Sequence, residues 1–386
     1  MYFFVSSHSL LQKLHTLYQI VNSKNSSSKY LIFEIIENQL KIIALCDSEN
    51  IVNTSIKVNA KKSTKEKVVV STKFMIDILT TFPNETLLFK KNKNALNICS
   101  EQGSYKIPIF FHKDSIDFFQ KKRPILRSST MKITLFSNII SKILNQTLFA
   151  VGDKKFQPIL NGVFFQFSPY EANFIATDTF RLVKYTIKNL KIDKSIEFTI
   201  SKKSLDIIRK ILKKEKNSNV VIEYNNKINV VFHFQNHIFS CRLINEKYPD
   251  YNSVIPNNNW DVSFIINRLL LLNTIRRISI FSKKRKNFIY LHLNHNKLKI
   301  CEQNTINNDN FESKIKCKPI FDDLKKTESI KMGFNSKFLI EILSSLNENF
   351  ICFELYYSNK IGILKPFSNE KKKKEESISI LIMSTI

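Results

Sequence analysis

The chain is poor in glycine, tryptophan and acidic residues, and it lacks the motifs of nucleotide-binding and hydrolytic enzymes. Only five of the 386 residues are glycine and one is tryptophan. The glycines are too scattered for the phosphate-cradling loops G-x-x-x-x-G-K-[ST] or G-x-G-x-x-G: Gly103, Gly152, Gly162, Gly333 and Gly362. Neither H-E-x-x-H nor G-x-S-x-G occurs. The motif content therefore gives no reason to expect an enzyme.

The six cysteines form no C-x-x-C pair and lie among apolar, strand-like runs. This spacing favours buried free thiols in a reducing compartment over disulfides or a metal site. The histidine pairs His233/His237 and His292/His295 have no nearby cysteine or carboxylate ligands. We therefore expect strand-surface histidines and no bound metal or cofactor.

The chain also lacks a long hydrophobic run. No segment approaches the roughly 20 apolar residues that a membrane-spanning helix needs. The N-terminal sequence MYFFVSS has neither the basic start nor the long apolar stretch of a signal peptide. We therefore expect a cytoplasmic protein without membrane contact.

Basic residues outnumber acidic ones, with 60 Lys and Arg against 33 Asp and Glu and a formal net charge of +27. Such an excess points to a polyanionic partner, with nucleic acid as the first candidate. The abundance of Lys, Asn, Ile and Phe is also what AT-rich coding produces, and this drift explains most of the excess. The placement of the charges is therefore more informative than their total.

Two helical segments recur along the chain with one common spacing. The segment at 71–79 (STKFMIDIL) returns at 202–208 (KKSLDII) and, more closely, at 335–343 (NSKFLIEIL). A second series at 10–14, 139–143 and 269–272 has the same spacing of about 130 residues. Two independent series with one period indicate a tripled domain, and each copy is long enough to hold its own core.

The predicted domains are residues 1–126, 127–255 and 256–386. Each has a first helix (9–21, 138–151 or 267–280), a second helix (73–82, 202–214 or 336–346) and about eight short strands. The helices have a single apolar stripe, such as Leu10, Leu14, Leu17 and Val21, and need a sheet to lie on. We therefore predict an α+β fold of three similar domains, each with two helices packed on antiparallel sheets.

The outward faces of these helices are basic at matching places in every copy. The candidate phosphate-binding residues are Lys13, Lys24, Lys73, Lys142, Lys154, Lys202, Arg209, Lys213 and Arg276. A solvated surface in a lysine-rich protein explains them as well as DNA contact does. No helix-turn-helix, zinc finger or RNP-type aromatic pair is present, so contact with phosphates alone predicts weak, sequence-blind and salt-dependent binding.

Three stretches resemble a known family: ATDTFRL at 176–182, KYPDY at 247–251 with VIP at 254–256, and MGFN at 332–335. They are similar to the bacterial DNA polymerase III beta subunit, the sliding clamp, and the resemblance covers essentially the whole chain. It implies a non-enzymatic DNA clamp fold of three domains per chain. Two chains would join head to tail into a ring around duplex DNA and act as a processivity factor for the polymerase.

The resemblance also implies two protein-binding sites. A pocket between the second and third domains would bind a short peptide of DNA polymerase III, the clamp loader, other polymerases and repair proteins. Its matching positions are Leu160, Thr177, Thr179, Phe180, Arg181, Leu182, Pro249, Val254, Leu381, Ile382 and Met383. Ordinary core packing is the alternative for these residues, and it is the better explanation of Leu160 or Leu182 taken alone. The homodimer interface, between the first domain of one chain and the third of the other, would include Tyr105, Ile107, Ile280 and Phe281.

The chain departs from the family pattern at Thr179 and Phe180, where we expect larger side chains to crowd one wall of the pocket. Two other functions stay open on the sequence alone. One is a basic nucleic-acid-binding protein that does not encircle DNA, and the other is an enzyme with a dispersed site.

Overall fold

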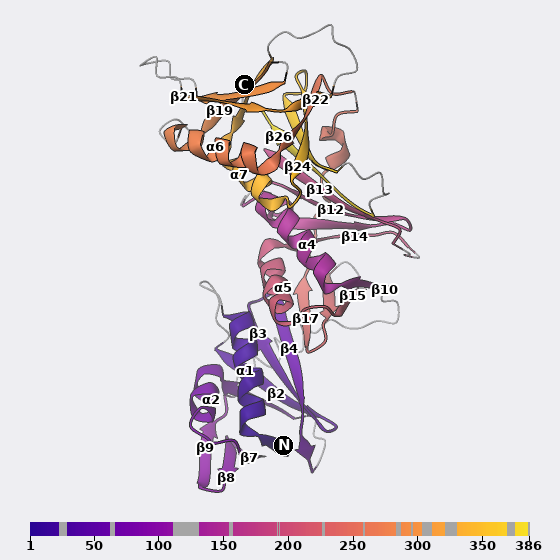
Figure 1. The fold of residues 1–386 in the computed structure, drawn as a ribbon. Coiled ribbons are helices and arrows are strands. Elements are labelled where there is room, and N and C mark those ends of the chain that lie inside the picture. The colour runs from indigo at the N-terminus through magenta and orange to yellow at the C-terminus, as the bar shows by residue number, and fades with distance from the viewer. Residues whose placement is uncertain are drawn as a thin grey trace. The chain divides into compact units, whose positions relative to one another are not determined.

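The chain forms two compact units in the computed structural model (Figure 1). The structure describes residues 1–22, 29–61, 66–110, 131–153, 157–190, 192, 194–225, 228–257, 259–282, 287–294, 296–302, 311–320, 330–368 and 375–384. The first unit contains Met1–Ser141 and Lys203–Leu243, and the second contains Lys142–Lys202 and Ile244–Ile386.

The first unit contains two antiparallel sheets. The eight-stranded sheet has the order β10 (Met131–Phe136), β15 (Asn219–Asn225), β16 (Asn229–His233), β17 (His237–Arg242), β4 (Asn50–Lys57), β3 (Gln39–Leu45), β2 (Tyr30–Ile36) and β6 (Lys67–Ser71). The five-stranded sheet has the order β5 (Asn59–Ala60), β1 (Tyr2–Ser6), β7 (Thr86–Lys91), β8 (Ala95–Ser100) and β9 (Gly103–Pro108). Its helices are α1 (Ser7–Val21), α2 (Thr72–Leu79) and all but the first residue of α5 (Lys202–Lys214).

The second unit also contains two antiparallel sheets. The nine-stranded sheet has the order β14 (Ile196–Ser201), β11 (Gly162–Phe167), β12 (Glu171–Thr177), β13 (Arg181–Lys188), β26 (Glu376–Met383), β25 (Ile361–Phe367), β24 (Phe350–Tyr356), β18 (Val262–Asn267) and β22 (Lys318–Ile320). The four-stranded sheet has the order β21 (Phe311–Lys316), β20 (Lys297–Glu302), β19 (Phe288–Asn294) and β23 (Ile330–Asn335). Its helices are α6 (Arg268–Ser282), α7 (Ser336–Ser345) and the short 3-10 turns η1 (Leu148–Ala150), η2 (Pro158–Asn161) and η3 (Tyr251–Val254). Helix α4 (Ser137–Thr147) crosses the boundary between the units.

The order of elements repeats three times along the chain. A strand leads into the first helix, and three strands follow, joined by the short β5 in the first copy and the short β22 in the third. Another strand then leads into the second helix, and three strands end the copy. The α+β fold with helices on antiparallel sheets is confirmed. The exact ends of the three copies stay a prediction, because sheets run on from one copy to the next where β4 pairs with β17 and β13 pairs with β26.

Polar side chains at the strand ends start the helices. The Ser6 and Ser71 hydroxyls each accept a hydrogen bond at 3.4 Å, from the N–H groups of Ser9 and Phe74. Asn335 accepts one from the Lys337 N–H at 3.0 Å. Such caps satisfy backbone donors that have no partner within the helix.

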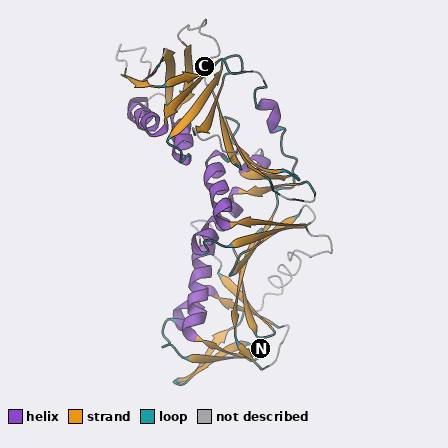
Figure 2. Cartoon of the chain, turned by 45° about the vertical axis from the view of Figure 1, so that its right-hand side comes forward, coloured by secondary structure: helices purple, strands orange, loops and turns teal. Residues whose placement is uncertain are grey.

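The helices cover one face of the sheets in each unit (Figure 2). In the first unit α1 packs against α2 and β4, and in the second α6 packs against α7, β20 and β21. The predicted apolar stripe of α1, Leu10 to Val21, is buried. Each fully buried Leu, Ile or Phe contributes roughly 1.5–3 kcal/mol relative to exposure, so these stripes fix the helices on the sheets.

The cysteines are free thiols, and the predicted burial holds for Cys46, Cys241 and Cys301, whereas Cys99, Cys317 and Cys352 are half-buried. Burial raises the pKa of the Cys46 thiol to about 12. The prediction of strand-surface histidines was wrong for His237, which is 3% exposed and whose Nδ1 contacts the buried Glu215 carboxylate. Among the described residues, no group of His, Cys, Asp and Glu side chains is placed to hold a metal ion. None of the described helices is long and apolar enough to cross a bilayer.

Candidate partner-binding and nucleic-acid-binding sites

The predicted pocket residues lie in the second unit, where β13 pairs with the last strand of the chain. Arg181 stands opposite Ile382, and Leu182 stands opposite Leu381. Successive side chains point to opposite faces of a strand. Leu182 and Leu381 therefore share one face of the sheet, and Arg181 and Ile382 share the other.

One hydrophobic cluster occupies the face of Leu182 and Leu381. Its buried members are Ile159, Leu160, Phe164, Ile175, Leu182, Tyr248, Tyr251, Tyr356, Ile361, Ile363 and Leu381, with Ile244, Ile255 and Trp260 packed against them. Three predicted pocket residues, Leu160, Leu182 and Leu381, thus belong to a single apolar floor. The floor is assembled from segments that are far apart in the sequence.

Several predicted pocket residues remain accessible to solvent. The exposed fraction is 48% for Val254 and 43% for Met383, and Pro249 is also exposed. Met383 extends the strand ladder, since its N–H donates to the Phe180 carbonyl at 2.9 Å. Covering such apolar surface gains about 25 cal/mol per Å², so these side chains favour association with an apolar partner.

The turn between β12 and β13 is built around the Asp178 side chain. Its Oδ1 accepts hydrogen bonds from the N–H groups of Phe180 at 3.0 Å and Arg181 at 2.8 Å. The Thr177 hydroxyl donates to the Arg181 carbonyl at 2.6 Å and accepts from the Thr179 N–H at 3.0 Å. Thr179 has a φ of 77°, in the left-handed region that β-branched residues rarely adopt.

Arg181 fixes this turn to the helical side of the sheet. Its side chain is 6% exposed, and its Nε and Nη2 donate to Asp178 Oδ2 at 3.0 and 2.8 Å. Nη2 also donates to the Phe149 carbonyl at 3.1 Å, and Nη1 pairs with Glu341. The guanidinium lies 4.1 Å from the centre of the Phe338 ring. Arg181, predicted to line the pocket, therefore points toward η1 and α7.

Phe180 also lies toward α7. Its side chain is 53% exposed, and its ring centre is 6.0 Å from that of Phe338. Phe180 is not a member of the hydrophobic cluster. Whether Thr179 and Phe180 hinder a bound peptide stays a prediction.

Three buried tyrosines of the cluster were not among the predicted residues. Tyr248 stacks on Phe164 with ring centres 4.6 Å apart, and the Tyr251 hydroxyl donates to Gln166 Oε1 at 2.7 Å. Burial, together with the nearby Glu354 carboxylate, raises the pKa of Tyr356 to about 12. The YPDY motif contains Tyr248 and Tyr251, so their aromatic character was the available signal.

The predicted phosphate-binding residues are mostly exposed. Exposed side chains are those of Lys73, Lys142, Lys202, Arg209, Lys213 and Arg276, whereas Lys13 is half-buried. Lys142 pairs with Glu376 at 3.1 Å and Arg209 with Asp206 at 2.7 Å. Within the described residues, Lys73, Lys202 and Lys213 have no carboxylate within ion-pair distance. Lys24 and Lys154 lie outside the described residues.

The predicted interface residues lie on or near the end strands of two sheets, as far as the described residues show. β9, which contains Tyr105 and Ile107, is the last strand of the five-stranded sheet, and β21 is the last strand of the four-stranded sheet. Tyr105 is 38% exposed, whereas Ile107 is buried. Ile280, near the end of α6, is 61% exposed, and the side chain of Phe281 lies outside the described part.

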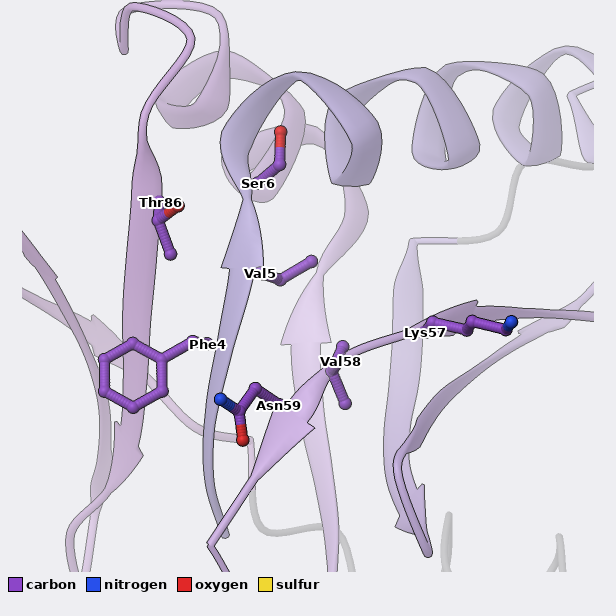
Figure 3. A pocket seen from close by; sticks show the side chains of 7 residues that line it. All are labelled: Phe4, Val5, Ser6, Lys57, Val58, Asn59 and Thr86. Atoms are coloured by element: carbon purple, nitrogen blue, oxygen red, sulfur yellow. The ribbon is translucent and has the colours of Figure 1, made fainter.

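A separate hollow of about 610 Å³ lies in the first unit (Figure 3). It is lined by Phe4, Val5, Ser6, Lys57, Val58, Asn59 and Thr86. None of the predicted site residues lines this hollow, and Lys57 is its only charged lining residue. We assign it no role in the candidate sites.

Comparisons with known proteins give a consistent result. Two DNA polymerase III beta subunit domain models match the chain, the central domain at residues 134–250 and the C-terminal domain at residues 252–378. Together these ranges cover more than half of the chain. The beta sliding clamp of Rickettsia bellii is 24% identical over 371 residues, which span 92% of this chain and 92% of that protein.

Solved structures share the fold. The DNA polymerase sliding clamp of Pseudomonas aeruginosa matches with a TM-score of 0.82 at 17% identity, covering 100% of this chain and 99% of the other. The sliding clamp of Bartonella birtlesii, solved bound to griselimycin, matches with a TM-score of 0.80 at 21% identity, again covering 100% and 99%.

Proposed function

This chain belongs to the DNA polymerase III beta subunit family, and from that premise we propose that it is a DNA sliding clamp. Two chains form a ring that encircles duplex DNA without reading its sequence and tethers the replicative polymerase. The chain is an accessory subunit without a catalytic site of its own. It acts in the cytoplasm, with the polymerase, the clamp loader and repair proteins as partners.

The observation that carries this proposal is a strand junction that occurs twice within the chain. β4 of the first copy pairs with β17, the last strand of the second, and β13 of the second copy pairs with β26, the last strand of the third. β9 is the last strand of the first copy, and β21 is the counterpart of β4 and β13 in the third. Each has a single neighbouring strand among the described residues, so a second chain joined head to tail would supply the other neighbour of each.

The two existing junctions predict the register of the third. Phe239 stands opposite Val52 in the first junction, and Ile380 stands opposite Val183 in the second. Residues of the three copies can be matched by their positions in the hairpins that precede the junctions. In this alignment Tyr105 corresponds to Phe239 and Ile380. In the same alignment Phe311 corresponds to Val52 and Val183. Tyr105 of one protomer should therefore face Phe311 of the other.

The size of duplex DNA supports two chains in a ring. A domain of this length has a radius of gyration of about 14 Å, which corresponds to a sphere about 36 Å across. Six such spheres leave a hole about 36 Å wide, whereas three leave only about 6 Å. Duplex DNA is about 20 Å wide and passes only through the larger hole.

The exposed basic residues supply contact with the DNA backbone. Exposed ion pairs such as Lys142–Glu376 contribute at most about 1 kcal/mol, so such cations can exchange a carboxylate for a phosphate. Contacts with phosphates do not depend on sequence, which allows the ring to slide. Closure of the ring, and not the strength of these contacts, prevents its escape.

The hydrophobic cluster of the second unit is the proposed partner pocket. Val254 and Met383 leave apolar surface exposed near its buried floor. These features suit a short peptide with apolar side chains.

The test of this function is retention on circular and linear DNA. The chain is loaded onto nicked plasmid with the clamp loader of the same organism and ATP, and half of the sample is then cut once. At a salt concentration that suppresses phosphate contacts, we expect the protein to remain on the circle and to leave the cut DNA. Equal release from both forms would reject encirclement.

A further inference from the structure

A small cavity lies in the first unit, at the junction of the first and second copies. Its volume is about 230 Å³, and it is lined by Leu45, Asp47, Ser48, Glu49, Ile51, Ile228, Asn229, Ser240 and Arg242. These residues come from the β3–β4 hairpin and from the β16–β17 hairpin that pairs with it. They are separate from the proposed partner pocket, which lies in the second unit.

The β3–β4 turn repeats the hydrogen bonds of the β12–β13 turn. Asp47 Oδ1 accepts from the N–H groups of Glu49 at 2.8 Å and Asn50 at 2.9 Å. Asp178 Oδ1 accepts from the N–H groups two and three residues further on in the same way. The two turns are therefore equivalent places in successive copies.

The strand that completes each junction is also equivalent. The Arg242 N–H donates to the Glu49 carbonyl at 3.1 Å, just as the Met383 N–H donates to the Phe180 carbonyl at 2.9 Å. Ser240 stands opposite Ile51, just as Leu381 stands opposite Leu182. The cavity thus occupies, in the first junction, the place of the partner pocket in the second: Ile51, Ser240 and Arg242 correspond to Leu182, Leu381 and Met383.

Three substitutions between the copies change the chemistry of the site. Ser240, Asn229 and Arg242 replace Leu381, Ile361 and Met383, so one side of the cavity is polar and basic. Leu45, Ile51 and the 59% exposed Ile228 keep the other side apolar. A ligand that fits both sides needs an apolar group next to an anionic one.

The carboxylates near the β3–β4 turn leave the Arg242 guanidinium available to bind an acidic group of a ligand. Asp47 pairs with Lys203 at 2.9 Å and accepts further hydrogen bonds from Asn50, so it is already compensated. No carboxylate of the described residues lies within ion-pair distance of the exposed Arg242 guanidinium, although Glu49 is the neighbouring residue across the strands. The site therefore favours an acidic group at its Arg242 end.

We propose that this cavity is a second peptide-binding site, which takes a short segment of a partner protein with a leucine-like side chain beside an acidic residue. The inference rests on the proposed function, because the equivalence is with the partner pocket of a clamp. The volume accommodates about one or two side chains, which is less than a typical ligand pocket holds. Binding is accordingly weak, with a Kd of roughly 0.1–1 mM.

The test uses two fluorescein-labelled octapeptides, GSDDLLGS and its basic counterpart GSKKLLGS. The full chain carries Met383→Asp, which places a charge on the rim of the first pocket and leaves the second cavity intact. Fluorescence anisotropy is measured at about 0.3 M salt, where general attraction to the basic surface is screened. We expect saturable binding of the acidic peptide, and binding of the basic peptide that is at least about tenfold weaker.

Charge variants locate the binding. Arg242→Glu should weaken binding of the acidic peptide at least about tenfold. Glu49→Gln should strengthen it, because it removes a competing carboxylate. Lys132→Glu makes the same charge change at an exposed residue of the same unit and should leave the affinity unchanged. Absence of saturable binding, or equal effects of Arg242→Glu and Lys132→Glu, would overturn the proposal.

This result is independent of the test of the clamp itself. Failure of the chain to stay on circular DNA removes the proposed ring without altering peptide affinity. Loss of the second site alone leaves retention on the circle intact. A photo-crosslinking group on the acidic peptide identifies the contact directly, and labelling of the first pocket instead of residues 228 and 229 would contradict the assignment.

Discussion

Two turns of the chain share their hydrogen bonds but differ in strain. Asp178 and Asp47 each accept from the two backbone N–H groups that follow. Thr179 has a φ of 77°, whereas Ser48, its counterpart, is not among the residues with positive φ. A left-handed φ costs a β-branched residue on the order of 1–2 kcal/mol. Of these two turns, only the one beside the proposed partner pocket is therefore strained.

Replacing Thr179 with glycine should stabilise the second unit. Glycine adopts a left-handed φ without steric cost but loses more entropy on folding, so the net gain is about 0.5–1 kcal/mol. The matched control is Ser48→Gly, which relieves no strain and should cost about 0.5–1 kcal/mol. Urea unfolding followed by circular dichroism measures both free energies. A loss of stability in both variants would show that the Thr179 backbone is not strained.

The burial of apolar residues in the proposed pocket could be predicted from the sequence, whereas the orientation of its polar residues could not. Leu182 and Leu381 belong to apolar runs, so their burial follows from composition and strand alternation. The orientation of Arg181 does not, because its partners Phe149, Phe338 and Glu341 come from distant segments. The burial of His237 was missed for the same reason, since Glu215 belongs to another element.

Helices were easier to predict than the strands that lead into them. The helices α1, α2, α4, α5, α6 and α7 all begin within two residues of the predicted positions. The unpredicted strands include β1, β6, β10, β14, β18 and β23, each of which runs directly into a helix. No glycine or proline separates strand from helix there, so only the change of hydrophobic period from 2 to 3.6 marks the boundary. Five or six residues are too few to show a period of 2 clearly.

Sheet junctions give an element-scale prediction about the dimer. The register that places Tyr105 opposite Phe311 also places Ser104 opposite Glu312 of the second protomer. Paired residues have Cα atoms about 5.5 Å apart in a hydrogen-bonded pair, which is within the range of a disulfide. The double variant Ser104→Cys with Glu312→Cys should therefore form a covalent dimer on mild oxidation, visible by non-reducing electrophoresis.

The control for this experiment shifts the register by two residues. Ser104→Cys with Lys314→Cys places the thiols too far apart along the strand and should give little covalent product. Both variants also carry Cys99→Ser, because the Cys99 thiol lies 3.5 Å from the Ser104 hydroxyl and would otherwise form a disulfide within the chain with the introduced cysteine. The other native cysteines are present in both variants and contribute the same background. Equal cross-linking of the two variants would contradict the proposed register, and a ladder of higher multimers would indicate open chains instead of closed rings.

Pro108 should make the proposed junction between chains weaker than the two junctions within the chain. It occupies the place of Arg242 and Met383, whose N–H groups each donate across their junctions. Proline has no N–H, so this hydrogen bond would be missing between the protomers of the proposed ring. A typical bond of this kind contributes about 0.5–1.5 kcal/mol, and we therefore expect the proposed ring to open between chains more readily than within one.

At the scale of the whole molecule, the net charge of +27 affects binding everywhere on the surface. A basic surface attracts DNA from a distance, and salt screens this attraction. Topological retention does not depend on screening once the ring is closed. High salt therefore separates encirclement from general attraction. The proposed clamp has two functions to distinguish, which are the tether to the polymerase and the hold on DNA.

The variant Met383→Asp should uncouple these two functions. Met383 is 43% exposed on the rim of the proposed partner pocket and lies in a different sheet from the proposed dimer edges, so a carboxylate there should leave the fold and the proposed ring intact. It would have to be desolvated beneath an apolar peptide, which costs more than about 1–3 kcal/mol and lowers peptide affinity at least about tenfold. Primer extension by the cognate polymerase should lose its stimulation by the clamp.

Retention of the same variant on circular DNA distinguishes this loss from misfolding. The matched control is Ile36→Asp, which adds the same charge at a 48% exposed aliphatic side chain of the first unit and should leave stimulation unchanged. If Met383→Asp stimulates the polymerase as well as the control does, the tether lies elsewhere on the ring. If Met383→Asp loses retention on circular DNA together with stimulation, the proposed pocket and the proposed dimer interface do not act independently.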